Sequence, residues 1–190
     1  INNQIDIKNQ KILSDLKDFF EFYVDHYFKT VNREFRRVFP NHLYLGCRLY
    51  EKTHGNIIVR KIAAKYCDVL SYNIYKYSID EFDFFKNLNK PVIIGEFHFG
   101  TGTHGVWGTG LRVAYNLEQQ AELYKQFVYE ASINPAIVGA HWFQWTDQPA
   151  TGRFDGENFR IGFVSITDQP YKTLVDATKY INSNLLEWRK

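Results

Sequence analysis

The strongest constraint in this sequence is a regular alternation of short apolar runs with longer amphipathic stretches. Four runs predict strands, at residues 42–49, 68–75, 91–99 and 137–145. Apolar side chains at spacings of three and four predict helices, at residues 9–39, 56–66, 79–88, 117–133 and 170–188. Strand–helix alternation with apolar strands is typical of a parallel sheet with right-handed crossovers. We therefore expect an α/β fold.

Two parallel architectures fit this alternation. A doubly wound open sheet usually carries a Gly-rich phosphate-binding turn after its first strand, but the glycines of GTGTHGVWGTG follow the third strand, at residues 100–110. A (β/α)8 barrel has eight strand–helix units and takes about 250 residues. The pattern of four units therefore predicts half of such a barrel, preceded by one extra helix.

Composition excludes several classes of protein. A net charge of +2 gives no basic field for nucleic acid, and no apolar run has the length of a membrane span. The 190 residues suffice for one domain. Aromatic residues reach 17%, which fits either an aromatic core or platforms that stack on sugars. The chain has no methionine and its start lacks a signal pattern, so we interpret the start as a fragment boundary.

A carboxylate ends the third predicted strand, PVIIGEFHFG at residues 91–100. The two-residue period of a strand places four side chains on one face: Val92, Ile94, Glu96 and His98. A buried glutamate is costly unless it is paired. Glu96 therefore either pairs with Arg48 or His141, or is a catalytic carboxylate at the C-terminal end of a barrel strand. Its position at that end favours catalysis.

The fourth strand ends in a dense mix of indole, amide and carboxylate groups. The candidates for binding a ligand are Trp142, Gln144, Trp145, Asp147 and Gln148. Aromatic rings stack on the apolar faces of a pyranose, and polar groups bind its hydroxyls. Alternation places Trp142 and Trp145 on different faces, so we expect at least one of them to bind a sugar. Packing in the core is the alternative.

Further candidates flank these strands. Asn73 and Tyr75 end the second strand, where a tyrosine hydroxyl that donates to Glu96 would hold the carboxylate in place; an ordinary aromatic strand end is the alternative. His98 and His104 could be ligands, but no third residue has metal spacing, so we predict no metal site. The long Gly-rich loop is typical of a lid or binding loop. GRFDGENF, residues 152–159, indicates turn chemistry.

Three runs closely resemble the C-terminal part of glycoside hydrolase family 50: GEFHFG, AHWFQWTDQPATGRFDGEN and IGFVSITDQPY. LYLGCR and DVLSYNIY, at residues 43–48 and 68–75, resemble its fifth and sixth barrel strands, and the resemblance covers residues 40–180. The family is known for β-agarases and belongs to a clan of retaining (β/α)8-barrel glycosidases. The resemblance implies that residues 1–190 are a single partial catalytic domain containing strands five to eight and lacking the first four.

The resemblance also implies roles for residues. Glu96 would be the nucleophile, with Tyr75 touching it and Asn73 nearby, and Trp142 or Trp145 would be the aromatic platform. The Gly-rich loop, with His104 and Trp107, would border the cleft for an oligo- or polysaccharide of the galactan type, such as agarose. Its sequence departs from that of agarases, which leaves the polysaccharide open. No cofactor is implied, and the family implies a secreted or periplasmic protein.

One departure from the clan concerns the acid/base. The clan uses a glutamate that follows an asparagine at the end of strand four, and no Asn-Glu pair lies at a strand end here. Retaining hydrolysis needs two carboxyl groups about 5 Å apart. We therefore expect the acid/base upstream of Ile1 and little or no activity in this chain alone. Exposed strand edges predict self-association or pairing with the missing half barrel.

Two other functions compete with this interpretation. A non-catalytic carbohydrate-binding protein would use the same tryptophans and loops without hydrolysis. A complete small α/β enzyme of unrelated chemistry would need a phosphate or nucleotide pocket, which the sequence does not support.

Overall fold

The protein is described by a computed structural model that covers residues 9–50, 52–81 and 88–189. The chain divides into two compact units, Ile1–Leu70 and Ser71–Lys190. None of the helices in these described ranges is long and apolar enough to cross a membrane.

The first unit is mainly helical. Its elements are α1 (Gln10–Val38), β1 (Arg48–Leu49), α2 (Lys52–Gly55) and α3 (Ile57–Tyr66). The Asn9 side chain caps α1 by accepting from the N–H groups of Lys11 and Ile12. Of the strand predicted at residues 42–49, only Arg48–Leu49 forms. Gly46 has a φ of +66°, a left-handed conformation that interrupts an extended run.

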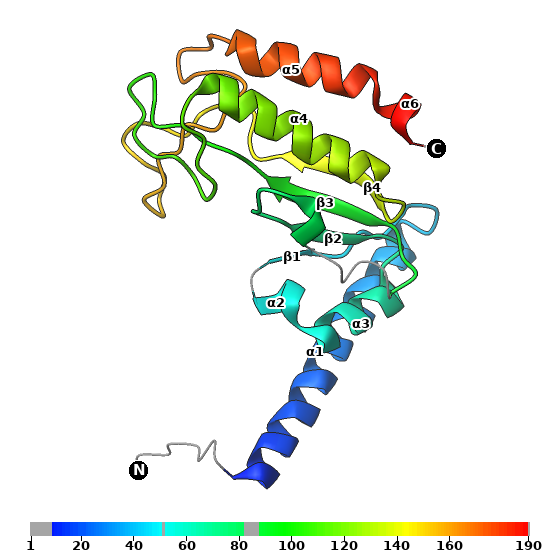
Figure 1. Ribbon diagram of the computed structural model, residues 1–190. Coiled ribbons are helices and arrows are strands. Elements are labelled where there is room, and N and C mark those ends of the chain that lie inside the picture. The colour runs from blue at the N-terminus through cyan, green and yellow to red at the C-terminus, as the bar shows by residue number, and fades with distance from the viewer. Residues whose placement is uncertain (1–8, 51, 82–87, 190) are drawn as a thin grey trace, which may run out of the picture. The chain divides into compact units, whose positions relative to one another are not determined.

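The second unit contains three neighbouring strands covered by helices (Figure 1). Its elements are β2 (Leu70–Asn73), η1 (Ile79–Glu81), β3 (Val92–Phe97), α4 (Leu117–Ile133), β4 (Ile137–Trp142), α5 (Lys172–Ser183) and α6 (Leu185–Trp188). β3 and β4 pair in parallel, with Val92 opposite Ile137 and Phe97 opposite Trp142. α4 has the predicted bounds. Of the helix predicted at residues 79–88, the part at 82–87 lies outside the described residues.

Aromatic packing joins β3 to α4. The Phe97 ring stacks on Phe127 of α4 at a centroid distance of 4.3 Å and meets Trp142 edge-on at 5.2 Å. Phe97 and its odd-numbered neighbours therefore face α4, whereas Glu96 and His98 lie on the opposite face of the strand. The predicted α/β class, with strand–helix alternation and parallel strands, is confirmed.

Removing the Phe97 ring should leave a cavity in this core. We expect Phe97→Ala to lower the free energy of unfolding by about 3–5 kcal/mol, because the side chain is buried and stacked. Urea unfolding followed by circular dichroism measures this change. Phe154→Ala removes the same ring from a fully exposed position and is the matched control. Equal losses in the two variants would contradict the prediction.

Candidate active site

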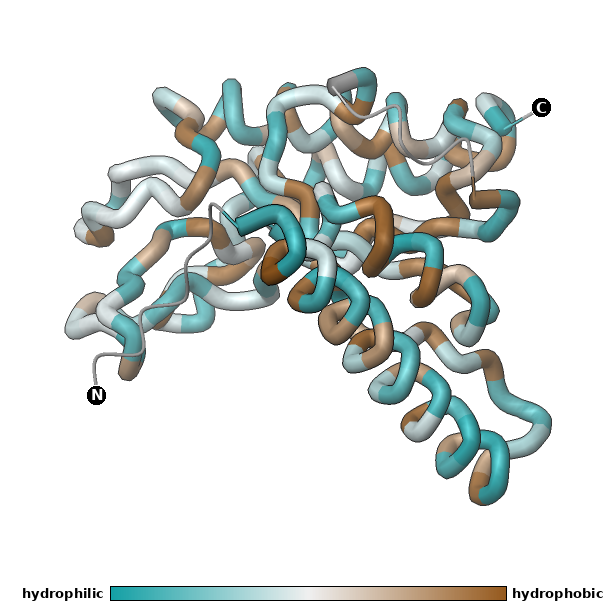
Figure 2. Tube along the Cα trace, turned by 90° about the horizontal axis from the view of Figure 1, so that it is seen from below, coloured by the Kyte–Doolittle hydropathy of each residue, from teal (hydrophilic) through white to brown (hydrophobic). Residues whose placement is uncertain are grey.

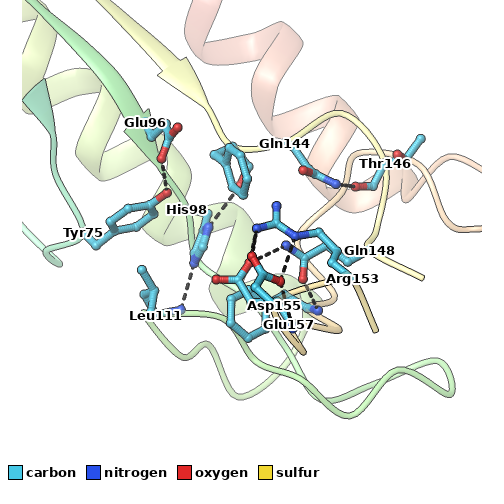
Figure 3. Close-up of polar contacts among 12 residues, drawn as sticks. Tyr75, Glu96, His98, Leu111, Gln144, Thr146, Gln148, Arg153, Asp155 and Glu157 are labelled. Carbon is cyan, nitrogen blue, oxygen red and sulfur yellow. Dashed lines mark hydrogen bonds and ion pairs between the residues drawn. The ribbon is translucent and has the colours of Figure 1, made fainter. Parts of the chain in front are cut away.

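The candidate site is built on Glu96, near the end of β3, and Tyr75, two residues after β2. The Tyr75 hydroxyl donates a hydrogen bond to Glu96 Oε2 at 2.6 Å (Figure 3). The backbone N–H of Ile74 donates to the Glu96 carbonyl at 2.8 Å, which fixes the two strand ends against each other. The contact predicted between this tyrosine and the carboxylate is therefore present. It orients the carboxylate from one side.

His98 directly follows β3, two residues after Glu96, and is 1% exposed. Its Nδ1 is 3.1 Å from the Phe143 carbonyl oxygen, and the Leu111 N–H donates to its Nε2 at 2.8 Å. An Nε2 that accepts places the ring proton on Nδ1, which donates to Phe143. Burial lowers the pKa of His98 to about 4, so the ring is neutral at neutral pH.

These two hydrogen bonds tie His98 to the residue after β4 and to the end of the Gly-rich loop. Gly110, beside Leu111, has a φ of +71°, and a Cβ atom there would lie 2.6 Å from His98 Nε2. Only glycine fits this approach without displacing the imidazole. Both ring nitrogens bond to main chain, which gives His98 a positioning role; that it binds substrate stays a prediction.

The Gly-rich loop folds back on its own start. Gly100 donates to the Arg112 carbonyl and accepts from the Ala114 N–H, both at 2.8 Å. Between these anchors His104 and Trp107 are exposed, with Trp107 at 82%. The Arg160 N–H donates to the Gly108 carbonyl at 2.8 Å and so joins this loop to the segment after β4. The two loops lie side by side beyond the strands (Figure 1).

Trp142, the last residue of β4, and Trp145, three residues after it, differ in environment. Trp142 packs edge-on against Phe97, on the α4 side of the sheet, and its Nε1 donates to the Ile161 carbonyl at 2.7 Å. Trp145 is 69% exposed. Between them Gln144 donates to the Thr146 carbonyl at 3.0 Å and follows a cis peptide bond. The structure thus separates Trp142 from Glu96 and leaves the ring of Trp145 accessible.

Three other predicted residues are buried. Asp147 accepts from the Tyr171 hydroxyl at 2.6 Å and from the Gly162 N–H at 2.7 Å. Gln148 is 0% exposed, and its side chain donates to Glu157 and accepts from the Phe159 N–H in the loop after β4. Asn73 is 9% exposed, and its Oδ1 has no hydrogen-bond partner within the described ranges. Asp147 and Gln148 thus support the loop after β4, and the part that either of them or Asn73 plays in binding substrate stays a prediction.

The sequence interpretation missed a charged group in the loop after β4. Arg153 forms ion pairs with Asp155 and, at 3.2 Å, with Glu157 (Figure 3). Its hydrogen bond to Asp155 is the main reason that the pKa of Arg153 is raised. The negative charge of Glu96 also contributes to that shift, so Arg153 lies within electrostatic range of the candidate site. The only signal in the sequence was one basic residue, at position 153, followed by two acidic residues at positions 155 and 157.

Within the described ranges, no group of three or more His, Cys, Asp or Glu side chains is placed to hold a metal ion.

Comparison with known proteins gives clear relatives, although no protein-family model matches the chain. Beta-agarase B from Vibrio sp. (strain JT0107) is 41% identical over an alignment of 189 residues that covers 96% of this chain and 20% of that relative. A solved exo-β-agarase is 42% identical over 95% of this chain and 25% of its own, with a TM-score of 0.89. A solved structure named PfGH50B is 41% identical over 97% of this chain and 26% of its own, also with a TM-score of 0.89. The chain is a glycoside hydrolase family 50-like protein.

The resemblance inferred from GEFHFG and the runs that follow it is therefore confirmed. This family 50-like chain spans a fifth or less of the curated agarases that it matches, with 20% of one and 17% of the other.

The pKa of His98 predicts a dependence of stability on pH. The imidazole titrates at about 4 in the fold and near 6.5 when unfolded. Between about pH 6.5 and 4 the unfolded chain protonates His98, whereas the folded chain does not. The free energy of unfolding should therefore fall by roughly 3 kcal/mol over this range. Below about pH 4 the ring is protonated in both states, so this group causes no further change. Urea unfolding across this range measures the slope.

His98→Gln should flatten the slope, whereas the matched exposed variant His141→Gln should retain it. An NMR titration of the His98 ring reports the same group without a substitution. A midpoint near 6.5 would contradict the prediction.

Proposed function

We propose that this chain supplies the nucleophile side of a retaining glycoside hydrolase that acts on a galactan such as agarose. The observation that carries the proposal is the Glu96 carboxylate near the end of β3, held by the Tyr75 hydroxyl at 2.6 Å. Its support from relatives is the identity of about 41% to a β-agarase.

In this proposal Glu96 attacks the anomeric carbon and forms a glycosyl-enzyme ester. An acid/base carboxyl group protonates the leaving oxygen and later removes a proton from the attacking water. The hydrogen bond from Tyr75 holds the carboxylate for attack. The exposed rings of Trp145 and Trp107 would stack on sugars that flank the cleaved bond, with Asn73, His104 and Gln144 as further polar contacts.

The acid/base must lie about 5 Å from Glu96. Two carboxylates of the loop after β4, Asp155 and Glu157, are paired with Arg153. We therefore assign the acid/base to a part of the enzyme outside residues 1–190. The chain covers 25% of a solved exo-β-agarase, so most of the length of that relative is available for the acid/base residue.

The same reasoning gives the architecture. We propose that residues 1–190 form strands five to eight of a (β/α)8 barrel, as one partial catalytic domain. The apolar face predicted for α1 supports a missing neighbour, because most of its side chains are exposed: Leu13, Leu16, Phe20, Tyr23 and Tyr27. The remaining half of the barrel would cover this face of α1. When that half is absent, a second copy of this chain would cover the face instead.

Exchange of segments tests the role of Glu96. Residues 1–190 replace the matching segment of the exo-β-agarase whose structure is 42% identical, and hydrolysis of agaro-oligosaccharides is measured. We expect the chimera to be active and Glu96→Gln to lower kcat/KM by about a thousandfold or more, because the attacking group is lost.

Glu118→Gln, an exposed carboxylate on α4, is the matched control and should retain activity. In a Glu96→Gly chimera, azide should restore turnover of an activated aryl galactoside and give the galactosyl azide of inverted configuration. An active chimera that tolerates Glu96→Gln would refute the nucleophile assignment.

The chain alone should bind without cleaving. We expect residues 1–190 to show no turnover of agaro-oligosaccharides and to self-associate, because the acid/base is absent and the α1 face is uncovered. Product analysis and light scattering at increasing concentration measure both. Turnover that disappears in Glu96→Gln would show that the chain holds both carboxyl groups, and a monomer at high concentration would contradict the uncovered face.

A further inference from the structure

The tip of the loop after β4 presents an aromatic ring to solvent. Phe154 is 100% exposed, an unusual position for a residue that is normally buried. It lies next to Arg153, whose guanidinium is 5.8 Å from the Phe154 ring and 5.9 Å from the Phe143 ring, and Phe143 directly follows β4. The ring is thus attached to the same loop that reaches the candidate site.

Backbone hydrogen bonds hold this tip in one shape. The N–H of Gly152 donates to the Pro149 carbonyl at 2.8 Å, and that of Gly156 donates to Arg153 at 3.0 Å. The Arg153 N–H in turn donates to the Glu157 carbonyl at 2.8 Å, which closes the turn around Phe154. The ring is therefore displayed by a fixed backbone, so little conformational entropy is lost when a ligand binds.

The base of the loop is anchored from inside the protein. The buried Gln148 side chain donates to Glu157 Oε2 at 2.8 Å and accepts from the Phe159 N–H at 2.7 Å. The Asp155 carboxylate accepts from the Glu157 N–H at 3.2 Å. These bonds place both carboxylates beside Arg153 and leave oxygen lone pairs toward solvent, since Asp155 is exposed.

This group also lies close to the proposed nucleophile. The charge of Glu96 acts on Arg153. Figure 3 shows Arg153, Asp155 and Glu157 gathered beyond the ends of β3 and β4, with His98 between them and the pair of Tyr75 and Glu96 in that view. If one sugar unit of a bound chain lies over Glu96, a neighbouring sugar unit of the same chain would therefore lie at the loop tip.

We propose that Phe154 and the Arg153–Asp155–Glu157 group form a subsite for a neutral pyranose next to the one attacked by Glu96. The ring of Phe154 stacks on the C–H face of that sugar, and the carboxylates accept hydrogen bonds from its hydroxyls. One guanidinium between two carboxylates leaves a formal charge of −1. Together with Glu96 this charge disfavours a sulfated or carboxylated sugar. The proposal rests on the proposed function.

Oligosaccharide length tests the stacking role. NMR titration of residues 1–190 with neutral agaro-oligosaccharides of two and six sugars measures the affinity of wild type, Phe154→Ala and Phe154→Trp. We expect Phe154→Ala to weaken binding of the hexasaccharide about tenfold, equivalent to 1.4 kcal/mol. Binding of the disaccharide should not change, and Phe154→Trp should retain hexasaccharide binding.

The matched control is Tyr180→Ala, which removes an exposed ring from α5 and should have no effect. Wild-type affinity in Phe154→Ala, or a wild-type affinity that does not rise with length, overturns the subsite. Either result leaves the proposed function standing, because that function is decided by Glu96 in the chimera.

Charge selectivity is tested by Asp155→Asn, which retains the acceptor oxygen for the Glu157 N–H and removes the charge. The ratio of affinities for a sulfated and a neutral hexasaccharide should rise about threefold at low salt, and the gain should shrink as salt is added. An unchanged ratio overturns the charge selectivity.

Discussion

The second unit depends on one buried, neutral imidazole. His98 accepts a hydrogen bond from the Leu111 N–H and donates one to the Phe143 carbonyl, so a single side chain fixes β3, the exit of β4 and the return of the Gly-rich loop. A charged ring could not accept the first of these bonds, and burial keeps the ring uncharged. Glu96 lies two residues before His98, so the same bonds hold the proposed nucleophile in place.

Two groups act on the Glu96 carboxylate. One is Tyr75, and the other is Arg153 of the loop after β4 with its paired carboxylates. Tyr75 touches it and limits its rotation. Arg153 acts on it through space, while its own charge is largely balanced by the paired carboxylates. A nucleophilic carboxylate needs a fixed direction but must remain reactive, and a direct ion pair would weaken it. The combination of one neutral donor and one screened cation suits that need.

The elements could be predicted from the sequence because their periods are strong and their caps are local. α4 has the predicted bounds. The apolar side chains that recur along α1 predict a helix of nearly its observed length (Figure 2). β1 was overestimated because the left-handed Gly46 is a tertiary feature. Glu96 and Tyr75 could be found from their places at strand ends. The partners of His98 could not, because Phe143 lies 45 residues further along the chain. The ion pairs of Arg153 are local, but its electrostatic effect on Glu96 depends on the tertiary fold.

The contact between Gly110 and His98 also bears on how such a protein can diversify. The return of the Gly-rich loop is fixed by Gly110, by the bond from the Leu111 N–H to His98 and by the two main-chain bonds of Gly100, and none of these contacts uses a side chain from residues 101–109. Within that stretch the exposed side chains of His104 and Trp107 can therefore change, whereas Thr101 and Val106 are buried and Gly108 leaves no room for a Cβ atom beside Asn158. In the proposed function, changes at these exposed positions would alter which polymer is bound while Glu96 keeps its place, so that recognition would evolve apart from chemistry.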